Sequence, residues 1–222
     1  MKLAVLYSGG KDSNYALFKS KDDAVCLISV ISKNKESYMF HTPNINLVDV
    51  QAKSIGLPLI KKITAGKKEE ELDDLKDAIR EAKKRFGIDG VVSGAVESVY
   101  QASRIQRICD DLGLWCFNPL WLKDQEKLLI ELMENKFEVI ISGVFAYPFN
   151  EKWLGRKINK NVIKELVGLK EKYKINPAGE GGEIETFVTN SPMFKKKIKI
   201  IESRKEWNRD SGIFKIMKAE LA

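Results

Sequence analysis

The fold is decided by residues 3–18, which read LAVLYSGGKDSNYALF. The first five of these residues are apolar and predict a buried strand, and the last five are compatible with a helix. The two glycines between them let the backbone adopt positive φ and approach a ligand closely. The turn also carries two hydroxyl groups and a positive charge, from Ser8, Ser13 and Lys11. Because the free N–H groups and the positive dipole end of the new helix point to the same place, the stretch predicts a phosphate-binding loop.

This loop differs from two widespread phosphate-binding motifs. A Walker A loop has a glycine five positions before its Gly-Lys pair and a Ser or Thr after the lysine, but Val5 and Asp12 occupy these positions. The dinucleotide fingerprint G-x-G-x-x-G is also absent. The pattern S-G-G-x-D-S resembles the PP-loop of ATP pyrophosphatases, which split ATP between the α and β phosphates. A Gly-Gly turn with a capping Asp or Ser is the structural alternative.

The composition is that of a globular protein. The chain has 222 residues, of which 44% are hydrophobic and 31% charged, with a formal net charge of +7. No apolar run approaches the roughly 20 residues that cross a bilayer, and the first residues lead into a strand rather than a signal peptide. We therefore expect a cytoplasmic protein without a membrane partner.

Cysteine, histidine and lysine usage narrows the classes of ligand. Three cysteines without a C-x-x-C pair and one histidine do not predict a zinc site. The 38 Lys and Arg residues are spread along the chain, so we favour a solvated basic surface over a nucleic-acid-binding one. The sequence does not determine the oligomeric state, and a homo-oligomer is possible.

Residues 1–150 alternate between two hydrophobic periods. Apolar runs at 24–32, 90–94 and 139–143 predict buried strands of the kind found in parallel sheets. Leu59, Ile60 and Ile63 suggest a further short strand at 59–63. Apolar residues at helical spacing predict helices near 72–86, 105–112 and 128–133. This alternation predicts an α/β protein with a Rossmann-like, doubly wound parallel sheet, which binds ligands at the carboxyl ends of its strands. After residue 150 the pattern changes, and residues 151–222 predict a smaller C-terminal α+β domain.

Serine-glycine pairs stand at three predicted strand ends, namely Ser8-Gly9, Ser93-Gly94 and Ser142-Gly143. Small residues at these points would let three loops bend over one shared nucleotide. For the second and third pairs, the chance coincidence of two common residues is an equally good interpretation.

The second informative segment is residues 179–186, which read GEGGEIET. Three carboxylates and three glycines within eight residues predict an acidic loop that holds a cation, orients an ammonium group or positions Mg²⁺ beside ATP. On composition alone, a solvated glycine turn is the preferred interpretation.

Three further motifs accompany these two in a specific order. They are MFHTPN at 39–44, YQASR at 100–104 and NPLW at 118–121. Nearly end to end, the chain resembles the archaeal–eukaryotic diphthine–ammonia ligase family of PP-loop enzymes. The resemblance implies that diphthine, a modified histidine on translation elongation factor 2, is amidated with ATP and ammonium, with release of AMP and pyrophosphate. It also implies a HUP-type domain for ATP at residues 1–150 and a domain for the protein substrate at residues 151–222.

The resemblance and the chemistry together assign expected roles. We expect ATP to be bound by Ser8, Gly9, Gly10, Lys11, Asp12, Ser13, His41, Ser93, Gly94, Tyr100 and Gln101. We expect catalysis to involve Lys11, Asp12, Arg104, Glu183 and Glu185. Asp12 is the nearest fixed carboxylate and the expected Mg²⁺ contact, with helix capping as its alternative role. His41 is expected to line the nucleotide pocket rather than to act as a base, and Arg104 either clamps a phosphate or forms a surface salt bridge.

The substrate's trimethylammonium group gives the acidic loop a specific expected task. Glu180, Glu183 and Glu185 would supply negative charge, and Phe187 or Trp153 would supply an aromatic face. Two alternatives remain for the whole chain. One is another PP-loop ligase that modifies tRNA, and the other is a non-catalytic adenine-nucleotide sensor.

Overall fold

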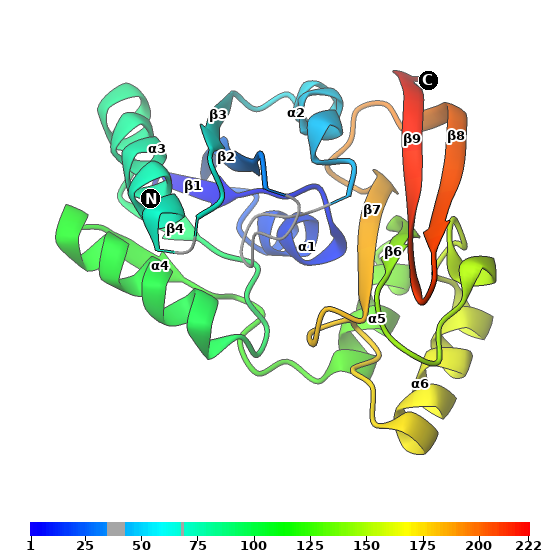
Figure 1. Ribbon diagram of the computed structural model, residues 1–222. Helices are drawn as coiled ribbons and strands as arrows, with labels where there is room; N and C mark the ends of the chain where they lie inside the picture. Colours follow the sequence, from blue (N-terminus) through cyan, green and yellow to red (C-terminus); the bar gives the residue numbers. More distant parts are fainter. Residues whose placement is uncertain (35–42, 68) are drawn as a thin grey trace.

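The first sheet grows outward from the strand that precedes the glycine turn. In the computed structural model, which describes residues 1–34, 43–67 and 69–222, β1 (Leu3–Leu6) pairs in parallel with β2 (Ala24–Ser32) and β4 (Gly90–Val92). β3 (Leu59–Thr64) and β5 (Trp115–Phe117) extend the two sides in parallel. The resulting order, β3-β2-β1-β4-β5 (Figure 1), confirms the predicted Rossmann-like sheet.

Helices cover both faces of this sheet. One face packs against α1 (Lys11–Lys19) and α2 (Val48–Ile55), and the other packs against α3 (Glu70–Phe86) and α4 (Val99–Leu112). The two longer helices were predicted from their spacing, and both end at a glycine in the left-handed region. No helix within the described ranges is long and apolar enough to cross a membrane.

The second sheet is antiparallel and has the order β7-β6-β9-β8. Its strands are β6 (Glu138–Val144), β7 (Ile184–Asn190), β8 (Ile198–Asn208) and β9 (Ser211–Leu221). The described residues also form α5 (Gln125–Glu134), α6 (Lys160–Tyr173) and the short helices η1 (Ile45–Leu47) and η2 (Glu151–Trp153).

The assignment of residues 139–143 to the parallel sheet was wrong, because β6 pairs antiparallel with β7 and β9. Both faces of β6 are nevertheless buried. Val139 and Ile141 join the main core, and Ile140 packs with Phe187 and Ile198 on the other face. A strand buried on both faces reads as a continuous apolar run in either kind of sheet. The division of the chain at residue 150 stays a prediction, although the second sheet already begins at Glu138.

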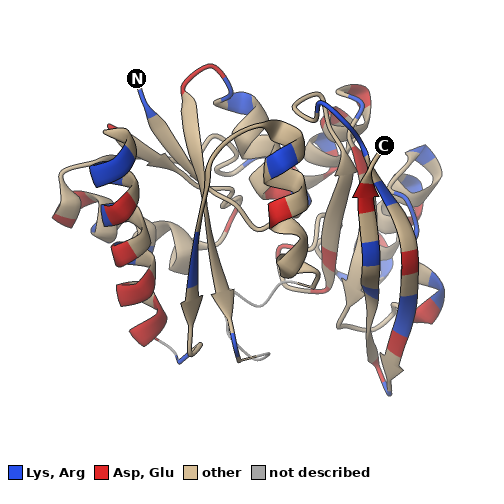
Figure 2. Cartoon of the chain, turned by 90° about the horizontal axis from the view of Figure 1, so that it is seen from above, with Lys and Arg blue, Asp and Glu red and all other residues tan. Residues whose placement is uncertain are grey.

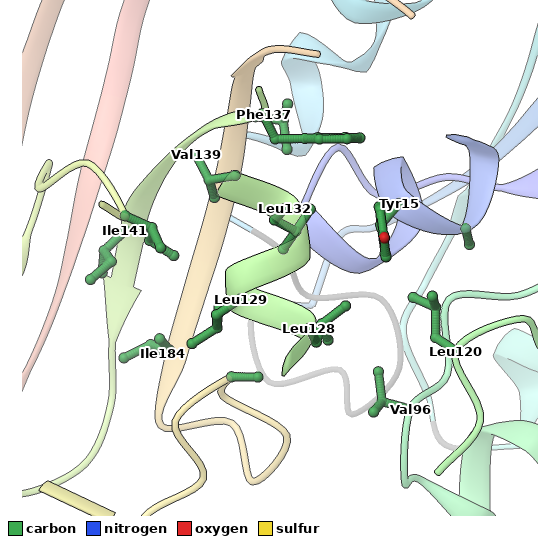
Figure 3. Close-up of a cluster of buried hydrophobic side chains, with 14 of the residues drawn as sticks. Tyr15, Val96, Leu120, Leu128, Leu129, Leu132, Phe137, Val139, Ile141 and Ile184 are labelled. Atoms are coloured by element: carbon green, nitrogen blue, oxygen red, sulfur yellow. The ribbon is translucent and has the colours of Figure 1, made fainter. Parts of the chain in front are cut away.

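One hydrophobic core joins the two sheets. Tyr15 of α1 belongs to the same cluster as Leu128 and Leu132 of α5, Val139 of β6 and Ile184 of β7 (Figure 3). Side chains from both halves of the chain thus pack into one interior, which holds β7 against the end of the parallel sheet.

Charged side chains are mixed over the surface. Figure 2 shows Lys and Arg positions spread along the strands and helices of both parts of the chain, with Asp and Glu positions between them. On α3, acidic residues in the first turn and basic residues in the last turn complement the helix dipole.

Candidate functional site

A cavity of about 610 Å³ opens at the carboxyl end of the parallel sheet. The strand order reverses between β1 and β4, so the loops after these two strands diverge and leave a crevice there. Glu185 and Thr186 of β7 line the same cavity, together with residues 179–182. Apolar side chains also contribute to the lining, namely Leu6, Ile28, Val30, Ile45, Leu75 and Ile105. The volume lies in the range of small-ligand sites.

The loop after β1 is fixed by elements of both sheets. It turns at Gly9, whose φ is +83°, a region that glycine adopts without strain. The Gly9 carbonyl accepts hydrogen bonds from Val188 N at 3.1 Å and from Gln51 Nε2 at 3.0 Å. Gln51 Nε2 also donates to the Val188 carbonyl at 2.8 Å, and the Gln51 side chain is fully buried. The turn therefore keeps its shape only while β7 stays in place.

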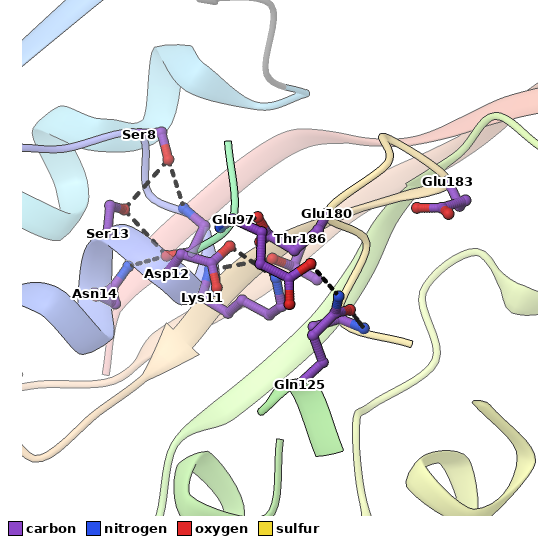
Figure 4. A network of polar contacts seen from close by, with 12 residues as sticks. Ser8, Lys11, Asp12, Ser13, Asn14, Glu97, Gln125, Glu180, Glu183 and Thr186 are labelled. Carbon is purple, nitrogen blue, oxygen red and sulfur yellow. Dashed lines mark hydrogen bonds and ion pairs between the residues drawn. The ribbon is translucent and has the colours of Figure 1, made fainter. Parts of the chain in front are cut away.

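The start of α1 is held in a similar way. The first N–H groups of a helix have no intrahelical acceptors, and the capping residue Gly10 offers no side chain. Thr186 Oγ1 of β7 accepts the Lys11 N–H instead, at 3.1 Å. Ser8 Oγ donates to Ser13 Oγ at 3.2 Å, and Ser13 Oγ donates to the Gly10 carbonyl at 3.1 Å (Figure 4).

Lys11 is a buried cation in the cavity lining. Only 3% of it is exposed, and its Nζ lies 2.7 Å from Asp12 Oδ2. Burial acts to lower the pKa of Lys11, but the combined attraction of Asp12, Glu180 and Glu185 outweighs it, so that the pKa is raised. The lysine is therefore charged at neutral pH and available to an anionic ligand.

Asp12 does not cap α1, which corrects the alternative drawn from the sequence. Its Oδ2 accepts from Lys11, and its Oδ1 is buried without a hydrogen-bond partner among the residues that the structure describes. An unsatisfied buried carboxylate oxygen calls for an explanation such as an absent ion or water. Asp12 thus offers an open ligand position beside the phosphate loop.

Two further carboxyl groups in the cavity titrate close to neutrality. Burial raises the pKa of Glu185 to about 7, with Lys11 opposing the rise and Asp12 adding to it. Burial likewise raises the pKa of Glu180 to about 7, where Asp12 adds to the rise and Lys11 opposes it. Glu180 Oε2 also accepts the Glu97 N–H at 3.3 Å. Groups with such a pKa exchange a proton near pH 7 and are suited to bind a cation or to accept a proton.

Glu183 organises the acidic loop instead of lining the cavity. Its Oε1 accepts from Asn176 N at 2.9 Å and from Asn176 Nδ2 at 2.8 Å, and its Oε2 accepts from Gly181 N at 2.9 Å. Figure 4 shows Glu183 apart from the Lys11–Asp12 pair. Of the three glutamates expected to supply negative charge, Glu180 and Glu185 therefore line the cavity and Glu183 does not.

Most of the residues expected from the sequence meet in the cavity. Those that line it are Ser8, Gly10, Lys11, Asp12, Ser13, Ser93, Gly94, Gln101 and Glu185. Gly9 is not among the lining residues, and its carbonyl accepts hydrogen bonds from Gln51 and Val188. His41 lies outside the described residues.

Tyr100 and Arg104 lie on α4 but outside the cavity lining. The Arg104 guanidinium stacks over the Tyr100 ring, 3.4 Å from its centroid, and donates to Glu69 Oε1 at 2.7 Å. Tyr100 OH donates to the same oxygen at 3.2 Å. In this arrangement the two residues join α4 to the start of α3, and their expected roles toward ATP stay predictions.

Two sequence interpretations are corrected here. Ser142 and Gly143 belong to β6 of the second sheet and do not reach the cavity. Phe187 and Trp153 are buried in hydrophobic clusters, so neither offers a face to a ligand. Phe145, which follows β6 and is partly exposed, lines the cavity instead, and Tyr7 is a second aromatic residue of the lining.

Glu180, which was expected to supply negative charge, lines the cavity. Sequence reasoning missed three residues of the site. Thr186 belongs to the GEGGEIET motif, so the motif itself was the signal that pointed to it. Gln51 and Phe145 stand in segments without a motif, and only their contacts identify them.

The chain is similar in sequence to proteins of known family. Residues 1–116 match the diphthamide synthase N-terminal domain, and residues 124–222 match the diphthamide synthase C-terminal domain. The chain is 33% identical over 220 residues to a diphthine–ammonia ligase of Rattus norvegicus, covering 89% of this chain and 82% of that protein. It is 32% identical over 225 residues to that of Homo sapiens, covering 91% and 84%.

Two other matches are weaker: one covers only part of the matched protein, and the other aligns with a low TM-score. The diphthine–ammonia ligase of Saccharomyces cerevisiae is 31% identical over 231 residues, which is 88% of this chain but 34% of the yeast protein. A solved structure described as a predicted subunit of a tRNA methyltransferase from Methanocaldococcus jannaschii aligns with a TM-score of 0.44 and 19% identity, over 86% of this chain and 98% of that one. The latter likeness is too distant to argue from.

Proposed function

The chain belongs to the diphthine–ammonia ligase family, and we propose that it converts diphthine on translation elongation factor 2 to diphthamide, using ATP and ammonium. One observation carries the proposal. The phosphate loop and the acidic loop meet in one cavity, with the buried cation of Lys11 close to Glu180 and Glu185. A site that activates a carboxylate with ATP and then admits ammonium needs both a phosphate cradle and negative charge. Because the substrate is a translation factor, we place the reaction in the cytoplasm.

The first step activates the carboxylate. A carboxylate oxygen of diphthine attacks the α phosphorus of ATP, a new C–O–P linkage forms, and the bond from the α phosphorus to pyrophosphate breaks. Negative charge grows on the departing pyrophosphate. Lys11 and the N–H groups in the first turn of α1 would stabilise this charge, since Lys11 lines the cavity and no side chain caps the helix from residue 10.

The second step forms the amide. Ammonium binds beside Glu180 and Glu185 and gives one proton to a carboxylate. Ammonia then attacks the acyl carbon, the C–N bond forms, the C–O bond to AMP breaks, and the nitrogen loses its extra proton to the second carboxylate or to water. A carboxyl group with a pKa of about 7 is a stronger base than one with the ordinary value of 4.5, which favours this proton transfer.

The residues present fit a magnesium ion that arrives with the nucleotide. The buried, unpartnered Oδ1 of Asp12 is an oxygen ligand of the kind Mg²⁺ prefers. No group of three His, Cys, Asp or Glu side chains in residues 1–34, 43–67 and 69–222 forms a metal site of its own, so ATP would supply the remaining ligands. When bound, Mg²⁺ neutralises charge on the phosphates. Asp12→Asn should lower the rate of pyrophosphate release more than it lowers ATP affinity.

A pyrophosphate-release assay tests the proposal. The full chain is incubated with ATP, ammonium and elongation factor 2 that carries either diphthine or an unmodified histidine, and mass spectrometry detects the amide. We expect release and amidation only with the diphthine-bearing factor. Release that depends on tRNA would favour another PP-loop ligase, and ATP binding without any release would favour a nucleotide sensor.

A further inference from the structure

Thr186 has a hydroxyl donor for which the described residues provide no acceptor. Only 4% of this residue is exposed, and it lines the cavity. Its Oγ1 accepts the Lys11 N–H at 3.1 Å. A hydroxyl group can accept and donate at the same time, yet within the described part of the chain no acceptor receives the Thr186 proton. A buried donor in a ligand cavity calls for an acceptor there.

The close approach of β7 to the phosphate loop explains the second glycine of the motif. A Cβ at Gly10 would lie 3.3 Å from the Thr186 carbonyl oxygen and 3.5 Å from Thr186 Oγ1. The first distance is tighter than an ordinary van der Waals contact. A side chain at residue 10 would therefore push β7 away from the start of α1. Thr186 Oγ1, which accepts the Lys11 N–H, would move away with the strand.

The register of β7 is fixed independently of Thr186. Val188 N donates to the Gly9 carbonyl, and Gln51 Nε2 bridges the Gly9 and Val188 carbonyls. Residue 186 thus stands at the start of α1 because residue 188 is held two positions further along. The strand cannot slide without breaking the two hydrogen bonds that Val188 makes, to the Gly9 carbonyl and from Gln51 Nε2.

We propose that Thr186 is a phosphate ligand that the second sheet contributes to the nucleotide site. Its oxygen accepts the Lys11 N–H, and its proton goes to an oxygen of the pyrophosphate moiety of ATP. The hydroxyl connects helix α1 and the ligand, so neither sheet alone completes the site. The inference rests on the proposed function only for the use of ATP.

Binding measurements on the full chain test this role. Thr186→Val keeps the shape of the side chain and removes the hydroxyl, and Thr186→Ser retains the hydroxyl. Thr189→Val is a matched control on the same strand, because Thr189 is also buried but donates to the Glu138 carbonyl away from the cavity. The affinities for ATP, pyrophosphate and AMP are measured by titration calorimetry.

We expect Thr186→Val to weaken ATP and pyrophosphate binding about tenfold, the effect of losing one hydrogen bond to a charged group. AMP affinity should stay unchanged, because AMP lacks the pyrophosphate moiety. Thr186→Ser should restore most of the ATP affinity, and Thr189→Val should lower thermal stability without changing ATP affinity.

Two results would overturn the inference. One is wild-type ATP affinity in Thr186→Val, which would leave Thr186 as a cap only. The other is an equal loss of ATP and AMP affinity, which would indicate general distortion of the site. The proposed function is tested separately by amidation: a wild-type protein that binds ATP but does not amidate diphthine refutes the function and leaves the role of Thr186 standing.

Discussion

Gly9→Ala perturbs the point where the phosphate loop meets the second sheet. Gly9 has a φ of +83°, and this region costs a residue with a Cβ about 1 kcal/mol. The added Cβ would overlap Gln51 Oε1 and lie 3.2 Å from Gln51 Cδ. Gln51 is fully buried and donates to the Gly9 and Val188 carbonyls. Displacing it breaks two hydrogen bonds of about 1 kcal/mol each, so we expect a total destabilisation of about 3 kcal/mol.

Urea denaturation, followed by circular dichroism, measures this free energy. Gly87→Ala is the matched control, because Gly87 also has a positive φ of +61° but no atom within 4 Å of an added Cβ. It should cost only the backbone strain of about 1 kcal/mol. In thermal melts the two variants should lose about 6–12 °C and 2–4 °C, respectively, for a chain of this size.

A double-mutant cycle separates strain from displacement. In a Gln51→Ala background the Cβ of residue 9 meets no amide, so Gly9→Ala should cost about 1 kcal/mol there. Gly9→Ala should also weaken ATP binding in the wild-type background, because the loop is displaced. The reasoning is refuted if Gly9→Ala costs no more than Gly87→Ala, or if removing Gln51 leaves its cost unchanged.

Three other predictions concern charged residues of the site and its rim. The pKa of Glu185 is raised by burial from 4.5 to about 7, so the native state binds its proton more tightly than the unfolded state, and stability falls as pH rises from about 4.5 to 7. Glu185→Gln should reduce this fall and melt above the wild type at pH 8, and identical melting curves would contradict the prediction. Glu183→Gln should loosen the acidic loop, because the Glu183 carboxylate accepts hydrogen bonds from three N–H groups. Amide hydrogen exchange at residues 176–183 should become faster, and exchange at the wild-type rate would argue against an anchoring role for Glu183. Arg104→Lys should leave ATP affinity unchanged, because Arg104 pairs with Glu69 outside the cavity lining, and calorimetry showing weaker ATP binding would instead place Arg104 on a phosphate.

The sequence by itself determined the elements that depend on local pattern. The strand, glycine turn and helix of residues 3–18 follow from hydrophobic period and from the φ freedom of glycine, and β1 and α1 appear there. The strand predicted at 59–63 is β3 (Leu59–Thr64), and the helix predicted near 128–133 is α5 (Gln125–Glu134). Such patterns are readable because each side chain's environment is set by neighbours three or four positions away, or two in a strand.

Only the tertiary structure decided which elements meet. The apolar run of β6 was read correctly as a strand but placed in the wrong sheet, because burial on both faces does not specify the pairing partner. Thr186 reaches Lys11 across 175 positions of sequence, and Gln51 reaches Val188 across 137. Hydrophobic period carries no information about contacts of this separation. The charge state of Glu185 was equally hidden, because its pKa depends on burial and on the neighbouring charges that folding brings to it.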